Sequence, residues 1–211
     1  MKRILALALF AACTPHRPIA DAPSFDSVRE RLEAQTANLF VGSTLDAGML
    51  GAEHLTDTGW QSGSAAVSIS TGELAVTIAG SGALEVSTLD LSFDSIDIPP
   101  SVFGTPAQLD NVRLQLPTPT ATPVTWSDND DVVATLSLEL SLSWSLAVNG
   151  GAIPLGAQML PPIPFDVTIG GDGSTVTASF ALHADGELWS WADLLKLTAI
   201  HVSADAATVE E

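Results

Sequence analysis

One segment of the chain alternates between apolar and polar side chains for seventeen residues, from Val132 to Val148. Every even-numbered position in it is apolar, and the odd-numbered positions are mostly Ser, Thr and Glu. Side chains of a β-strand point alternately to its two faces, so this period of two predicts a strand with one buried face. At about 3.3 Å per residue the segment would span about 55 Å. Leaving its apolar face in water would forfeit about 15 kcal/mol, so something must cover it.

The rest of the sequence predicts a sheet that is both long and curved. Between Ala83 and Ile98 the apolar positions change parity twice. A β-bulge explains each change, because one extra residue turns the apolar side inward again and bends the strand. Turn-forming clusters such as Gly170-Gly171-Asp172-Gly173 separate further strand-like segments. We therefore predict a mainly β fold whose long, curved antiparallel sheet forms a sandwich, a barrel or a wrapped tube.

Two capping-box patterns predict helices beside this sheet. Ser27-Val28-Arg29-Glu30 opens an N-terminal helix that runs to about Phe40. Ser190-Trp191-Ala192-Asp193 opens a short late helix that ends at about Leu197. The stretch 43–63 has mixed polarity and predicts no regular element.

The layer that covers the apolar face decides between functions. A second sheet would complete a filled sandwich or barrel. A long curved sheet beside a helix instead resembles the tubular lipid-binding (TULIP-like) architecture, a resemblance of fold over Ser27–Val202 that involves no motif. It implies a groove for acyl chains lined by the apolar side of the alternating segment, namely Leu136, Leu138, Leu140, Leu142 and Trp144. A barrel in the bilayer fits less well, because the chain has no Tyr for interfacial girdles.

The first thirteen residues have the features of an export signal. Lys2 and Arg3 precede a nine-residue apolar run, Ile4–Ala12, which is far shorter than the roughly 20 residues of a membrane-spanning helix. Phe10-Ala11-Ala12-Cys13 resembles a bacterial lipobox, in which the cysteine is lipidated and becomes the new N-terminus. This resemblance implies a signal peptide over residues 1–12 and lipidation of Cys13. The prolines that follow indicate a tether, so that 13–23 hold the lipidated cysteine and tether, and the length of the rest fits a single domain over 24–211. The resemblance also implies attachment to a membrane of the cell envelope, with the outer membrane favoured because Thr14 rather than Asp follows the cysteine.

The charge of the chain limits its partners. The 25 acidic residues outnumber the seven basic ones, and the net charge is −18. A surface of this sign repels phosphate backbones, so we expect no nucleic-acid partner. The acidity is explained either by solubility or by capture of a cationic or protein partner.

The sequence predicts no catalytic, metal or cofactor site. The four histidines, His16, His54, His183 and His201, show no metal-ligand spacing. His183 falls on the polar side of its strand and is expected to face solvent. The cluster Asp128-Asn129-Asp130-Asp131 lacks the full calcium-loop pattern and is typical of a turn.

These observations favour a non-catalytic envelope lipoprotein that binds a lipid or another apolar ligand within the curved sheet. The alternative is a structural or adhesive β-sandwich module that binds a protein partner through its acidic surface. The volume of the interior distinguishes them, because an acyl chain needs several hundred Å³ whereas a sandwich is filled.

Overall fold

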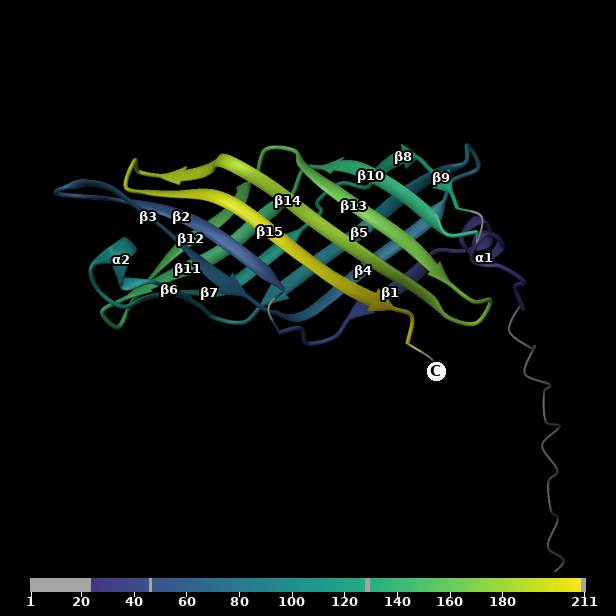
Figure 1. Ribbon diagram of the computed structural model, residues 1–211, viewed down its shortest axis with the longest axis horizontal. Helices are drawn as coiled ribbons and strands as arrows, with labels where there is room; N and C mark the ends of the chain where they lie inside the picture. The colour runs from purple at the N-terminus through teal and green to yellow at the C-terminus, as the bar shows by residue number, and fades with distance from the viewer. Residues whose placement is uncertain (1–23, 46, 128–129, 210–211) are drawn as a thin grey trace, which may run out of the picture.

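The computed structural model describes residues 24–45, 47–127 and 130–209. Within these ranges, fifteen strands form one antiparallel sheet and two short helices, α1 (Val28–Ala34) and α2 (Pro100–Phe103), lie near its opposite ends (Figure 1). No helix in the described part of the chain has both the length and the apolar character needed to cross a bilayer.

In chain order the strands are β1 (Ala37–Val41), β2 (Gly48–Thr56), β3 (Gly59–Val67), β4 (Ile69–Ile78), β5 (Ala83–Phe93), β6 (Ile96–Ile98), β7 (Ala107–Gln115), β8 (Thr120–Pro123), β9 (Thr125–Trp126), β10 (Val132–Leu138), β11 (Ser141–Val148), β12 (Gly151–Met159), β13 (Ile163–Gly171), β14 (Val176–Trp191) and β15 (Leu195–Ala207). Hydrogen-bonded neighbours follow the order β12-β11-β7-β5-β4-β1-β15-β14-β13-β10-β9. Three branches extend this path, because β2 with β3 pairs on β15, β6 pairs on β7, and β8 pairs on β5. The path has two ends, β12 and β9, so the described strands do not close into a barrel.

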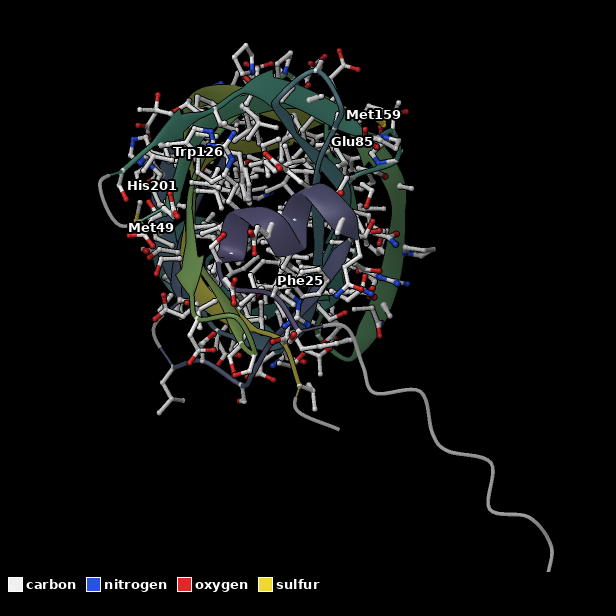
Figure 2. The ribbon with its side chains drawn as sticks, turned by 90° about the vertical axis from the view of Figure 1, so that its right-hand side faces the viewer. Phe25, Met49, Glu85, Trp126, Met159 and His201 are labelled. Carbon is white, nitrogen blue, oxygen red and sulfur yellow. The ribbon has the colours of Figure 1, made fainter. Side chains whose placement is uncertain are left out.

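The sheet curls around one elongated apolar core. Viewed along the long axis, the strands form a ring with side chains pointing into it, and α1 lies at the end of the ring that faces the viewer (Figure 1 and Figure 2). The helix contributes Val28 and Leu32, which are 4% and 0% exposed. No polar or charged side chain counts among the buried residues of the described ranges. The opposing sides of the curled sheet therefore cover each other's apolar faces, which supplies the layer that the alternating segment requires.

The segment from Val132 to Val148 confirms the predicted buried face but forms two strands rather than one. β10 ends at Leu138 and pairs with β13 and β9, whereas β11 begins at Ser141 and pairs with β7 and β12. Within two residues the chain thus passes from β10, next to the last strand of the path, to β11, next to its first strand. Leu138, Leu140 and Leu142 all stay buried across this break. Periodicity determines which side chains point inward, but it does not determine which strands pair.

The two changes of parity between Ala83 and Ile98 have different causes. The first is a bulge, as predicted, because Ala75 and Val76 of β4 lie opposite Thr88 and Val86, which leaves Ser87 as the extra residue of β5. The second is a break. β5 ends at Phe93, and the chain pairs again with β7 as the separate strand β6.

The N-terminal helix begins where the capping box predicts but ends early. The Glu30 backbone N–H donates to Ser27 Oγ at 3.2 Å, and Glu30 Oε2 accepts a hydrogen bond from the Asp26 N–H at 2.9 Å. The helix ends at Ala34, not near Phe40. The residues that follow form β1, whose alternating burial places every second side chain in the core between β4 and β15.

The prediction of a late helix is wrong. Residues 190–197 end β14, turn and begin β15, with Ala192 and Asp193 at φ values of 48° and 54°. The Leu194 N–H donates to the Trp191 carbonyl at 2.8 Å, which closes a type I′-like hairpin turn. The second helix is instead α2, with Pro100 at its start and Gly104 at a left-handed φ of 68° at its end. The stretch 43–63, for which no element was predicted, contains most of the β2–β3 hairpin.

Candidate metal centre

The five residues predicted to line an acyl groove lie in the filled core. Their exposed fractions are 3% for Leu136, 0% for Leu138, 0% for Leu140, 2% for Leu142 and 6% for Trp144. Trp144 lines a small apolar cavity beside α2, together with Val102 and Leu197, and its volume is about 20 Å³. Such a cavity has room for about one water molecule and is too small for an acyl chain. The structure brings the five residues together as core, packed against other side chains.

A different group of side chains gathers on the outer face of the sheet. His183 and Asp185 of β14 and His201 of β15 place one ligand atom each within 4.8 Å of one another. The Asp185 carboxylate bridges the two Nε2 atoms, with Oδ2 at 3.2 Å from His183 Nε2 and Oδ1 at 2.9 Å from His201 Nε2. The imidazole rings stack with centroids 3.9 Å apart. Both Nε2 atoms therefore face the same carboxylate.

The register of β14 and β15 positions this group. His183 lies directly opposite His201 in the antiparallel pair, and directly opposed residues point to the same face of a sheet. Asp185 follows His183 by two residues and therefore shares that face. The register shifts directly after Asp185, where Gly186 has a φ of 108°, a conformation that favours glycine. This bulge lets the two strands continue to their hairpin turn beyond the site.

The spacing of the ligand atoms is compatible with a divalent transition-metal ion once the two rings turn toward it. Metal–ligand bonds of about 2.0–2.2 Å place two ligands of a tetrahedral ion about 3.3 Å apart. The two contacts of Asp185, at 3.2 and 2.9 Å, are near this spacing, whereas the three ligand atoms together lie within 4.8 Å of one another. Two imidazoles with one carboxylate are a donor set found in zinc and non-haem iron proteins. The His183 and Asp185 side chains are both 63% exposed and that of His201 is 30% exposed, which leaves coordination positions open to solvent.

The electrostatic surroundings favour a cation. The net charge of −18 attracts positive ions to the surface in general. Lys196, near the start of β15, donates to Glu187 Oε2 at 2.5 Å. This hydrogen bond, with the charge of Glu187, raises the pKa of the Lys196 ammonium group, and the carboxylate balances its charge.

Sequence reasoning missed this group. His183 faces solvent as predicted, but the interpretation of the histidines as isolated is wrong, since His183 and His201 stack. The signal that could have found the pair is the hairpin turn at Ala192 and Asp193, because a hairpin pairs the residues on its two arms. Because residues 190–197 were predicted to form a helix, no hairpin was expected there, and the pairing of His183 with His201 was not predicted.

The other polar features of the sequence have structural roles. His54 Nδ1 lies 3.2 Å from the Val102 carbonyl oxygen, and its ring stacks on Phe103, so it holds α2 against β2. Asp172 accepts hydrogen bonds from the hydroxyl and N–H of Ser174, which stabilise the predicted glycine-rich turn and lower the pKa of Asp172. Of the acidic turn, Asp128 and Asn129 lie outside the described residues, as do the lipobox-like segment, Cys13 and the tether.

Comparison of the chain with protein-family models, with curated proteins and with solved structures gives no match. Function is therefore inferred from the site itself.

Proposed function

We propose that this protein is an envelope lipoprotein whose β domain binds a divalent transition-metal ion at His183, Asp185 and His201. The observation that carries the proposal is the preassembled donor set, with three ligand atoms within 4.8 Å on two adjacent strands. The neighbouring strands hold β14 and β15 in register, so little backbone ordering is needed when the ion binds.

The cellular location belongs to the same proposal. A basic N-terminus, a nine-residue apolar run and the lone Cys13 support export and lipidation. Acyl chains on Cys13 would attach the domain to the membrane by burying CH₂ groups at about 0.8 kcal/mol each. Attachment would then not require a basic protein surface, which is consistent with the acidic chain.

The interior of the sheet favours a structural module as the scaffold of this site. Lipid binding within the sheet has weaker support, because the five apolar residues expected to contact a ligand pack in the core, and the cavity that Trp144 lines holds about 20 Å³. The filled core supports the alternative of a rigid module that presents its outer surface to a partner.

Calorimetric titration of Zn²⁺ into the full chain tests the metal site. All variants should carry Cys13→Ser, so that the one thiol of the chain does not compete for metal. We expect one ion per chain and a loss of affinity of at least about tenfold for His183→Gln and His201→Gln, since disturbing even outer-shell partners costs about 10–100-fold.

The matched control is Asp205→Asn, which removes an exposed carboxylate on β15, outside the site, that accepts a hydrogen bond from Ser179. This variant should bind Zn²⁺ like the parent chain. Equal affinities for the parent and both histidine variants would overturn the proposal.

A further inference from the structure

A methionine extends the row of ligands on the outer face. Met49 of β2 lies directly opposite His201 of β15, and His183 of β14 lies opposite His201 on the other side. The three residues therefore form a row across β14, β15 and β2. Figure 2 shows His201 and Met49 next to each other on the outer side of the sheet.

We infer that the bound ion is copper and that the Met49 thioether is an additional ligand for its reduced state. This inference rests on the proposed metal site and identifies the ion that the site takes. Of the two methionines that the structure describes, Met49 and Met159, Met49 is the one placed beside the histidine pair.

From its place in the row the Met49 thioether can reach the neighbouring His201 ring. Directly opposed residues of an antiparallel pair have Cβ atoms about 4.5–5.5 Å apart, a gap that the long, flexible methionine side chain can span. The next residue, Leu50, is 7% exposed and faces the core, so Met49 faces outward. On its other side Met49 lies opposite Ala66, whose small side chain leaves Met49 room to adjust.

Ligand chemistry distinguishes copper from zinc in this arrangement. Imidazole nitrogens suit both metals, whereas soft thioether sulfur selects Cu(I). The carboxylate of Asp185 is a hard ligand that suits Cu(II). The two histidines with Asp185 would hold Cu(II), and the two histidines with Met49 would hold Cu(I). Zn²⁺ needs only the histidines and Asp185, so its binding does not depend on Met49.

Paired affinity measurements on the full chain carrying Cys13→Ser test the inference. Cu(I), kept reduced by ascorbate without oxygen, is competed against a chromogenic Cu(I) chelator, and Zn²⁺ is titrated in parallel. Met49→Leu removes the sulfur while nearly conserving side-chain volume, so the fold is retained. We expect it to weaken Cu(I) binding by about 10–100-fold and to leave Zn²⁺ binding unchanged.

The matched control is Met159→Leu, which removes a 55% exposed methionine from β12 and should change neither affinity. Unchanged Cu(I) affinity in Met49→Leu, or an equal loss of Cu(I) and Zn²⁺, would overturn the role of Met49. Binding of Zn²⁺ without Cu(I) by the parent would overturn copper but leave the proposed function intact. Binding of neither ion would overturn both.

Discussion

His183 and His201 stack with ring centroids 3.9 Å apart and with an angle of 16° between their planes. Nitrogen lone pairs lie in the plane of the imidazole ring, so rings this close to parallel hold them in two nearly parallel planes. A single metal ion requires lone pairs that converge, so binding must rotate the two rings away from parallel stacking. The free site is assembled, but it is not yet in its coordinating geometry.

This relationship predicts a spectroscopic change when Zn²⁺ binds. Ring currents in the stacked pair shift the imidazole protons of both residues upfield, and we expect these NMR signals to move downfield as the rings separate. His54 stacks on Phe103 away from the site and serves as an internal control whose signals should stay constant. Retention of the upfield shifts at saturating Zn²⁺ would contradict binding by both rings.

The filled interior predicts the effect of truncating a core residue. Leu138 is 0% exposed, and Leu138→Ala should lower the free energy of unfolding by about 2–5 kcal/mol, because the lost side chain leaves a cavity. Val133, on the opposite face of the same strand, is 44% exposed, so Val133→Ala should change stability by less than about 1 kcal/mol. Urea unfolding of both variants measures the difference. A small effect of Leu138→Ala would indicate that the interior is looser than the structure shows.

The sequence could predict which residues face inward far better than which strands meet. The even-numbered positions of 132–148 are buried as expected, because a period of two follows directly from strand geometry. The break at Glu139 and Leu140 leaves that period intact, so nothing in the pattern marks it. Ser190 and Asp193 suit both a capping box and a turn, since both residue types hydrogen-bond to nearby backbone in either structure. The histidine pair depends on that turn and on the bulge at Gly186, which no local pattern reports.

The close approach of Gly48 to β15 predicts that a side chain at this position would disturb both strand pairing and the metal site. A Cβ atom at this position would overlap the backbone carbonyl oxygen of His201, so Gly48→Ala must push β2 away from β15 beside Met49. We expect a loss of stability of about 1–3 kcal/mol, as for overpacking elsewhere in proteins. Under the copper proposal, Cu(I) affinity should fall more than Zn²⁺ affinity. Gly42→Ala is the control, because an added Cβ would meet no atom within 4 Å. Equal melting temperatures for the two variants would contradict the close approach of β2 to β15.

The ion pair of Asp90 with Arg113 predicts that the stability of the protein depends on pH. Arg113 Nε donates to Asp90 Oδ1 at 2.7 Å, and Gln115 Nε2 donates to Oδ2 at 3.1 Å. The hydrogen bond from Arg113 is the main cause that lowers the pKa of Asp90, and partial burial opposes it. An unfolded Asp has a pKa of about 3.9, so the folded state binds fewer protons near that pH. The stabilisation is therefore present above about pH 4 and is lost as the pH falls through the lowered pKa of the folded state.

We expect Asp90→Asn to reduce the free energy of unfolding by about 0.5–1 kcal/mol at pH 6, since the Arg113 side chain is 50% exposed and the pair is screened by solvent. The difference from the parent should shrink below pH 4, and urea unfolding between pH 2.5 and 7 measures it. Any Asp→Asn change also relieves repulsion in a chain of net charge −18, so a control is needed. Asp97→Asn provides it, because Asp97 accepts its hydrogen bond from the neutral amide of Gln108. If the Asp90→Asn difference did not depend on pH, or depended on it no more than the Asp97→Asn difference, the ion pair with Arg113 would not be the source of the stabilisation.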